Sequence, residues 1–383
     1  MNDIRIETIS TAKKILIKVG SAVLTGADGL DLKIIHSLVQ EMCDLTRRGY
    51  SIVLVTSGAI ASGKHRLGSA EKTKSIPEKQ AFAAVGQGRL MRVYSKAFEK
   101  NNLYVAQILL TLSDLTDRRR YLNIRNTLSK LMEWHVTPII NENDTVAVDE
   151  IKFGDNDNLA AMIANVVGAD LFINLTTTDG LYNADPATDK NARRIPLVKE
   201  IDAAVEAAAS DKTSTVGTGG MKSKILAAKK VTAIGIPCII APGKSKNVLL
   251  GIMAGKDIGT LFLPQSERLA SRKYWIAFTL HPRGRLTLDE GAARALIEKG
   301  TSLLPSGITH VEGEFDAGDP VTCLDVRGNI LAKGLVNYSS ADIKLIHGLK
   351  TTQILSVLGH KDYDEVIHRD NLVITGDLRK NKN

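Results

Sequence analysis

Short, continuous apolar runs recur between residues 14 and 240, and each is followed by a polar or glycine-containing loop and then a segment with helical periodicity. Strands that are apolar throughout are typical of parallel sheets buried on both faces. Strands that alternate with helices place those helices on the two faces. We therefore expect an α/β fold, a three-layer αβα sandwich with a mainly parallel central sheet. The expected strands are residues 14–19, 51–56, 103–110, 136–140, 171–175 and 236–240.

Six segments of the same region carry apolar side chains at helical spacing. The longest, residues 77–100, begins with a proline that suits a first helical turn, although Gly86 and Gly88 weaken a helix locally. The expected helices are residues 31–48, 77–100, 117–133, 157–167, 201–209 and 221–234.

The pattern changes after residues 263–264. From residue 274 onward the segments are short and rich in glycine turns, and residues 313–320 and 326–330 are typical of β-hairpins. One helix, residues 290–299, interrupts them. We expect two domains, residues 1–265 with the α/β sheet and residues 272–375 as a small, mostly β domain.

Charge is distributed unevenly along the 383 residues. The net charge is +8, yet residues 272–383 hold 15 Lys and Arg against 14 Asp and Glu, which leaves 35 against 28 in residues 1–271. An excess of basic charge on the larger part favours an anionic small molecule over RNA binding by the C-terminal part.

Three scattered cysteines, Cys43, Cys238 and Cys323, have no spacing typical of disulfides or metal sites, which indicates a reducing compartment. The first ten residues contain no apolar core of a signal peptide. No apolar run approaches the ~20 residues of a membrane helix. We expect a cytoplasmic protein without membrane contact.

One polar stretch separates an apolar run at residues 134–140, expected to be a buried strand, from an apolar helix at residues 159–167. It holds two clusters, Asn-Glu-Asn-Asp at 141–144 and Gly-Asp-Asn-Asp-Asn at 154–158. Open α/β sheets bind ligands in loops that follow strand ends, so the stretch is a candidate ligand site. The alternative is a solvated loop that uses Asn and Asp for turns and a helix cap, but that accounts for only part of two dense clusters.

Metal and triad chemistry find little support in the sequence. A calcium loop starting at Asp155 is excluded, because Val166 occupies the twelfth position, where such a loop needs Glu. Asp157 itself could serve only as the N-cap of the following helix, a common role for Asp. Histidines and cysteines never cluster, which excludes a zinc site and a Ser-His-Asp triad.

Lys18 lies near the end of an otherwise apolar strand, where a lysine is seldom without a partner. It could pair with a carboxylate as structure or meet a phosphate at the strand end. Residues 58–64 fit the first seven positions of a Walker A loop, but His65 replaces the required Ser or Thr. We interpret Gly58 as a residue that lets a ligand approach Ser57, and a simple strand-to-helix turn is an equal alternative.

Residues 217–224 (Gly-Thr-Gly-Gly-Met-Lys-Ser-Lys) form a glycine-rich loop that opens a helix. Free N–H groups and the helix dipole there favour a phosphate, and Lys224 lies one turn into the helix. The segment is not a Rossmann fingerprint, because no strand immediately precedes it and the third glycine is missing.

Taken together, these motifs resemble the glutamate 5-kinases of the amino-acid kinase family, over nearly the whole chain. The C-terminal part, with residues 289–292 and 303–307, is similar to the PUA domain appended to bacterial members. The resemblance implies the amino-acid kinase fold followed by a PUA domain. The segments that carry it are residues 17–21, 55–60, 84–87, 140–144, 154–159, 179–182, 185–186 and 217–224.

The resemblance implies ATP-dependent phosphorylation of the γ-carboxylate of L-glutamate, the first step of proline biosynthesis. It further implies Mg²⁺ held largely by ATP, inhibition by proline, and catalysis by Lys18, Lys224 and Asp157, with Asp157 orienting both lysines. The implied glutamate-binding residues are Ser57, Asn141, Asp144 and Asn156. The implied nucleotide-binding residues are Lys18, Thr176, Thr177, Thr218, Gly219, Gly220, Met221, Lys222, Ser223 and Lys224.

A carboxylate acceptor with a pKa of ~4.3 is already ionised at neutral pH and needs no general base, which agrees with the lack of a clustered histidine. The family usually has an acidic residue at the position of Thr177, so the nucleotide contact there differs. Related kinases act on acetylglutamate, aspartate, carbamate or UMP. We expect a homo-oligomer. Two roles stay open for the C-terminal domain: RNA binding, which its near-neutral charge disfavours, and regulation or assembly.

Overall fold

The computed structural model describes residues 2–26, 29–68, 75–147, 156–184, 186, 189–208, 220–264 and 282–374. The chain divides into two compact units, Met1–Arg268 and Leu269–Asn383. The domain limits expected at residues 265, 272 and 375 fall outside the described residues, so they stay predictions.

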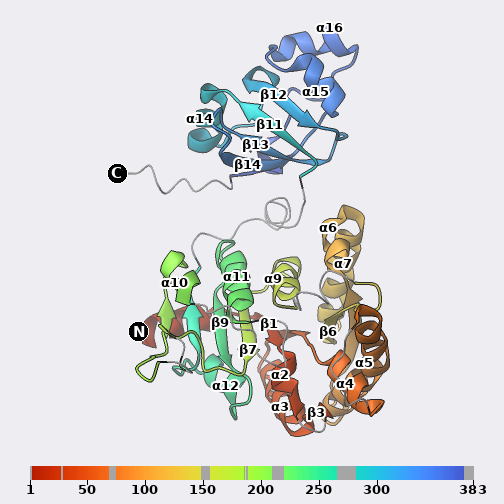
Figure 1. Cartoon of the computed structure of the whole chain (residues 1–383), viewed down its shortest axis with the longest axis vertical. Helices are drawn as coiled ribbons and strands as arrows, with labels where there is room; N and C mark the ends of the chain where they lie inside the picture. Colours follow the sequence, from red (N-terminus) through yellow and green to blue (C-terminus); the bar gives the residue numbers. More distant parts are fainter. Residues whose placement is uncertain are drawn as a thin grey trace. The chain divides into compact units, whose positions relative to one another are not determined.

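The larger unit is built on one eight-stranded sheet with the strand order β5-β6-β4-β1-β7-β9-β10-β8 (Figure 1). All neighbouring strands in it are parallel except β9 and β10. The strands at its centre are buried on both faces, which explains their continuous apolar sequences. The strands are β1 (Lys14–Val19), β4 (Ser51–Val55), β5 (Val105–Leu110), β6 (Thr137–Glu142), β7 (Leu171–Thr176), β8 (Leu197–Val198), β9 (Cys238–Pro242) and β10 (Thr260–Phe262), with a separate ribbon of β2 (Thr25–Gly26) and β3 (Gly29–Leu30).

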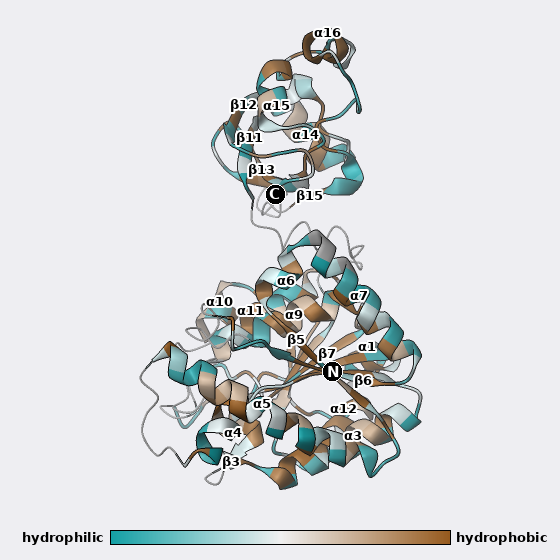
Figure 2. Cartoon of the chain, turned by 90° about the vertical axis from the view of Figure 1, so that its right-hand side faces the viewer, coloured by the Kyte–Doolittle hydropathy of each residue, from teal (hydrophilic) through white to brown (hydrophobic). Residues whose placement is uncertain are grey.

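Helices of this unit surround the sheet. Figure 2 shows mostly hydrophobic colours along the strands, whereas the helices combine hydrophobic and hydrophilic residues. Such helices bury one side and expose the other. They are α1 (Asn2–Ser10), α2 (Ser21–Leu24), α3 (Leu32–Arg47), α4 (Ala59–Arg66), α5 (Ile76–Glu99), α6 (Leu112–Thr116), α7 (Arg118–Glu133), α9 (Asn156–Val166), α10 (Ala203–Ala208), α11 (Met221–Thr232) and α12 (Val248–Met253).

Alternate residues of β1 show how the two faces are covered. Ile15 and Ile17 belong to a core shared with residues of α3, α5 and α12. Lys18 lies on the opposite face, where α9 contacts β1 and α11 packs against α9. The expected three-layer αβα sandwich with a mainly parallel sheet is therefore confirmed.

Most expected elements end within two residues of the observed ones, but the strand expected at 134–140 is displaced. Trp134 is 63% exposed, and β6 continues to Glu142. Asn141 and Glu142, which we expected in the loop, are buried strand residues. The polar residues of a strand end can be buried because neighbouring side chains satisfy them, as they do for Asn141.

Several short elements of the unit were not predicted. They include α1, α6, α12, β8 and β10, none longer than nine residues. Arg5 of α1 is 4% exposed and donates hydrogen bonds to the backbone carbonyls of Pro196, Ile258 and Gly259. These contacts connect α1 with residues almost at the other end of the unit, a relationship that local sequence cannot reveal.

Two glycines allow α4 and α5 to touch at their backbones. A Cβ at Gly86 would lie 1.8 Å from the carbonyl oxygen of Ala59, and one at Gly63 would lie 1.8 Å from that of Phe82. Gly86 is therefore a packing requirement of α5. The Walker-like segment 58–64 is mainly the first turns of α4, which begins after Gly58 with φ of 101°, so the helix-forming reading of its Ala-Ile-Ala run is confirmed.

The smaller unit contains a five-stranded sheet with the order β12-β11-β13-β14-β15. Residues 326–330 connect antiparallel β13 and β14, as expected of a hairpin. The hairpin expected at 313–320 is wrong, because β11 lies between β12 and β13 and pairs with both. Its elements are β11 (Gly284–Leu288), α14 (Glu290–Lys299), η2 (Pro305–Gly307), β12 (Ile308–Gly313), β13 (Pro320–Leu324), β14 (Ile330–Leu335), α15 (Ser340–Ile346), η3 (Thr351–Gln353), α16 (Ile354–Leu358), η4 (Arg369–Asn371) and β15 (Leu372–Ile374).

In the part of the chain that the structure describes, no helix has both the length and the apolar character needed to cross a membrane. The cytoplasmic location stays a prediction.

Candidate active site

One buried carboxylate, that of Asp157 on α9, joins four elements of the larger unit. Lys18 Nζ of β1 lies 2.5 Å from its Oδ1, and Lys224 Nζ of α11 lies 3.1 Å from its Oδ2. Asn174 Nδ2 of β7 donates to Oδ1 at 2.9 Å, and Ser223 Oγ of α11 donates to Oδ2 at 2.6 Å. Each carboxylate oxygen therefore accepts two hydrogen bonds.

The sheet register and two helix starts produce this convergence. Lys18 and Asn174 are partners across the parallel strands β1 and β7, so their side chains share one face near the carboxyl ends of the strands. Asp157 lies in the first turn of α9, and Ser223 and Lys224 lie in the first turn of α11. Because the Asp157 carboxylate bonds to three other elements, its alternative role as a mere N-cap is not supported by these contacts.

Burial and charge act against each other at Asp157. Burial raises the pKa of this carboxyl, but the adjacent charges of Lys18 and Lys224 outweigh it and hold the pKa well below the usual range. Asp157, Lys18 and Lys224 are 1%, 4% and 6% exposed. Among the described residues, this cluster holds two cations and one anion in a site with little water, which favours an anionic ligand.

Asn156, the residue before Asp157, begins a chain of hydrogen-bonded amides that we call the amide relay. Its Nδ2 lies 2.9 Å from the backbone carbonyl oxygen of Thr56 and 3.1 Å from Asn141 Oδ1. A carbonyl oxygen only accepts, so this contact fixes the orientation of the Asn156 amide. Asn141 then presents its oxygen to Asn156 and its nitrogen to Gln87 of α5, whose Oε1 accepts at 2.9 Å.

Two buried atoms of the amide relay have no hydrogen-bond partner among the described residues, the acceptor Asn156 Oδ1 and the donor Gln87 Nε2. Leaving such a group unsatisfied costs about 1–3 kcal/mol. The hydroxyl of Ser57 lies 2.8 Å from Asn156 Nδ2. An unpaired donor and an unpaired acceptor on one chain of hydrogen-bonded amides match a ligand with both anionic and cationic groups.

The structure brings together three of the four residues expected to bind glutamate, namely Ser57, Asn141 and Asn156. Asp144 lies in the turn after β6 and is partly exposed, and its role stays a prediction. Asn156 and Asp157 are consecutive residues of α9. The amide relay, which contacts Asn156, is therefore next to the two lysines, which contact Asp157.

The residues expected to bind nucleotide lie at two places. Thr176 is the last residue of β7 and is buried, and Thr177 follows it in an exposed position. Gly220 is the N-cap of α11 and has no side chain that could accept hydrogen bonds from the first N–H groups of the helix, and residues 221–224 form the first turn. Thr218 and Gly219 lie outside the described residues.

No group of three or more His, Cys, Asp or Glu side chains in the described part of the chain could hold a metal ion. A magnesium ion carried by ATP stays a prediction.

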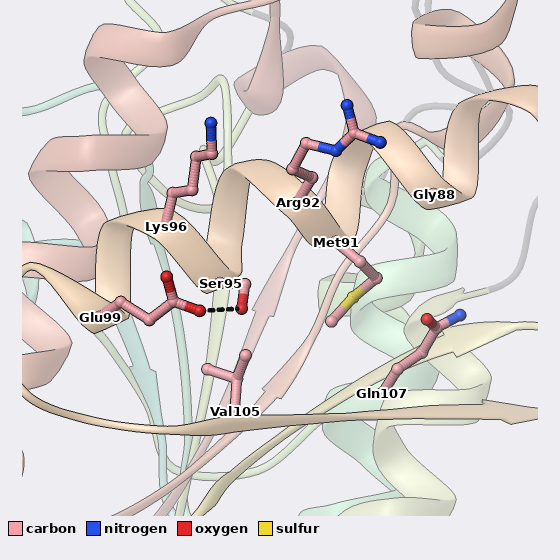
Figure 3. A pocket seen from close by; sticks show the side chains of 8 residues that line it. All are labelled: Gly88, Met91, Arg92, Ser95, Lys96, Glu99, Val105 and Gln107. Atoms are coloured by element: carbon pink, nitrogen blue, oxygen red, sulfur yellow. Dashed lines mark hydrogen bonds between the residues drawn. The ribbon is translucent and has the colours of Figure 1, made fainter.

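A groove of about 700 Å³ lies elsewhere, between α5 and the edge strand β5 (Figure 3). It is polar at its rim, where Ser95 Oγ donates to Glu99 at 2.8 Å. None of the expected site residues lines it. The lining residues are Gly88, Met91, Arg92, Ser95, Lys96, Glu99, Val105 and Gln107.

Sequence reasoning missed two members of the site and part of the role of a third. Asn174 is the single amide in the apolar run of residues 171–175, and that position was a usable signal. Gln87 lies in segment 84–87, one of those that carry the family resemblance, but the sequence assigned it no role. Ser223 was expected to contact nucleotide, yet its hydroxyl also bonds to Asp157.

Comparison with known proteins agrees with this geometry. The profile of the amino acid kinase family matches residues 13–242, and that of the PUA domain matches residues 284–358. A glutamate 5-kinase of Syntrophus aciditrophicus is 66% identical, covering 100% of this chain and 99% of the relative. Glutamate 5-kinases of Syntrophotalea carbinolica and Thermoanaerobacter sp. (strain X514) are 50% and 51% identical, covering 97% and 94% of this chain and 99% and 97% of those proteins.

Proposed function

The chain belongs to the amino acid kinase family, and from this premise we propose that it transfers the terminal phosphoryl group of ATP to the γ-carboxylate of L-glutamate. The proposal is supported by relatives that match nearly its full length, at 66% and 50% identity, and are glutamate 5-kinases. The products are ADP and L-glutamyl 5-phosphate, the latter an intermediate that leads to proline.

The observation that carries the proposal is that consecutive residues of α9 serve two different clusters. Asn156 belongs to the amide relay, and Asp157 holds Lys18 and Lys224. An amino acid bound by the relay therefore lies beside two buried cations. This is the arrangement needed to bring two anionic substrates together.

The reaction requires charge neutralisation more than proton transfer. An oxygen of the γ-carboxylate forms a bond to the γ-phosphorus while the bond from that phosphorus to the β,γ-bridging oxygen breaks, and the electron pair leaves with ADP. Lys18 and Lys224 offset the negative charge of the transferring group, and Asp157 fixes the position of both ammonium groups. The acceptor is already ionised, so no general base is needed.

The start of α11 suits the phosphates of ATP. Gly220 leaves the first N–H groups of α11 without a side-chain cap, and such helix starts bind anions. We assign the nucleotide to this turn together with Thr176 and Thr177 at the end of β7. Mg²⁺, when bound with ATP, supplies further neutralisation of the phosphate charge.

Inhibition by proline and assembly into a homo-oligomer are further parts of the proposal. Proline, like glutamate, carries a carboxylate and a cationic amine on one carbon, so the unpaired atoms of the amide relay suit either molecule. Proline is then expected to compete with glutamate and not with ATP. Inhibition that depends on ATP concentration alone contradicts this site, and sedimentation of the full chain tests the oligomer.

The substrate is tested by trapping the acyl phosphate with hydroxylamine in the presence of ATP and Mg²⁺. We expect hydroxamate from L-glutamate and much less from aspartate, N-acetylglutamate or carbamate. A larger yield from another acid shows that the glutamate assignment is wrong, while leaving the kinase assignment intact. No product from any acid contradicts both.

A further inference from the structure

We infer that Asn174 is a positioning residue that holds the Asp157 carboxylate in the orientation needed by the two lysines. This inference rests on the proposed phosphoryl transfer and adds a residue to it. The side-chain amide of Asn174 donates a hydrogen bond to Asp157, so we expect it to act through the carboxylate.

Burial of the Asn174 amide costs free energy unless a hydrogen bond of the amide offsets that cost. The residue is 0% exposed in β7, whose six residues are all buried, and its Oδ1 has no hydrogen-bond partner among the described residues. An apolar side chain at this position would avoid the burial of that oxygen. The bond from Nδ2 to Asp157 is the interaction that offsets this cost.

Asn174 and Lys18 act on the same atom. They are partners across β1 and β7, and both donate to Asp157 Oδ1, at 2.9 and 2.5 Å. Two donors on Oδ1 leave the other oxygen turned toward Ser223 and Lys224. Without the amide, one flexible lysine alone fixes Oδ1, and the carboxylate can rotate away from the geometry that spaces the two ammonium groups.

The test replaces the amide by a side chain of similar size without donors. Asn174→Leu is expected to lower kcat about tenfold, the effect of one hydrogen bond to a charged group, and to leave KM for glutamate and ATP within about threefold. Asn165→Leu is the control, because Asn165 is also a buried asparagine of this unit but donates to Tyr121, at 3.4 Å. Unchanged kcat in Asn174→Leu, or an equal loss in the control, overturns the inference.

A double-mutant cycle separates a role exerted through Asp157 from a general structural role. If Asn174 acts through the carboxylate, Asn174→Leu changes kcat less than about twofold when Asp157→Asn is already present. A full tenfold effect in that background overturns the inference.

The same cycle measured on the free energy of unfolding needs no substrate. Coupling between the two positions is expected there, and strict additivity contradicts the contact. If the wild-type protein phosphorylates an acid other than glutamate, the same kcat ratios are measured with that acid. The glutamate assignment is then wrong, and the kcat ratios measured with the other acid still test the role of Asn174.

Discussion

Lys18 and Lys224 contact different oxygens of one buried carboxylate, Lys18 from the sheet and Lys224 from the helix layer. Ion pairs that only stabilise a fold do not need two cations on one anion, since the second adds a desolvation cost. The two cations instead agree with the phosphate site that we propose there. The carboxylate acts as a spacer that keeps two repelling ammonium groups at fixed positions.

In the proposed reaction, Lys224 supplies one of the two positive charges next to the transferring phosphoryl group. Lys224→Ala is expected to lower kcat roughly 100- to 1,000-fold, as for other transition-state donors, while the fold persists because Lys18 still pairs with Asp157. Lys229→Ala is the matched control, since Lys229 lies on the same helix and pairs with Glu206 at the surface. Near-normal turnover in Lys224→Ala, measured by hydroxamate formation, excludes Lys224 from the phosphoryl site.

Asp157→Asn tests the pH dependence of this cluster. The substitution removes the negative charge that Lys18 and Lys224 share and is expected to lower the free energy of unfolding at pH 7 by about 3 kcal/mol. The folded-state pKa of Asp157 is depressed, so its stabilisation is complete above the unfolded value of ~3.9 and is lost as pH falls through the folded value.

The difference in unfolding free energy between wild type and Asp157→Asn should therefore be constant near neutral pH and narrow below about pH 4. Denaturant titrations between pH 3 and pH 7 measure it. A difference that narrows already between pH 5 and pH 7 contradicts the depressed pKa.

The sequence predicts those structural features that a single segment determines, and it does not predict those that depend on contacts between segments far apart in the chain. Apolar runs identify β1 and β7 because the residues of each segment are themselves sufficient to indicate a buried strand. The pairing of Lys18 with Asn174 cannot be predicted from either segment, because strand order depends on contacts between segments more than 100 residues apart. The resemblance to a family supplied the expected role of Asp157, but it assigned no role to Gln87, which lies in the matching segment 84–87, and it did not include Asn174.

Glycines illustrate the same limit. Gly86 has a low helix propensity, so local reasoning counts it as a weakness of α5. The structure shows that the contact with α4 requires it, and that contact is a property of two segments. The strand end at Asn141 was misplaced for a related reason, because polar residues suggest a loop until their buried partners are known.

Gln87 is expected to contribute to glutamate binding through its unpaired Nε2. Gln87→Leu removes this donor and the acceptor for Asn141, and should raise KM for glutamate about tenfold with KM for ATP unchanged. Gln87→Glu keeps the acceptor but places an anion where the substrate carboxylate is expected, so its KM for glutamate should be higher still.

Gln107→Leu is the control for Gln87, because Gln107 lies in the separate groove beside β5 (Figure 3). Steady-state kinetics with each substrate varied in turn distinguish the outcomes. If Gln87→Glu binds glutamate as well as wild type does, Nε2 does not face the substrate carboxylate.

Two glycines of α5 that are two residues apart, Gly86 and Gly88, give a sharp test of the α4–α5 contact. Gly86→Ala places a Cβ 1.8 Å from the carbonyl oxygen of Ala59 and should lower the free energy of unfolding by about 1–3 kcal/mol, the usual cost of overpacking. Gly88→Ala meets nothing within 4 Å and should be neutral or stabilising by up to ~1 kcal/mol, because alanine favours the helix. Since Gln87 lies between them, Gly86→Ala should also raise KM for glutamate, whereas Gly88→Ala should not. If the two variants are equally stable in denaturant unfolding, α4 and α5 can move apart without a decrease in the free energy of unfolding. The close approach of their backbones at Gly86 is then not required.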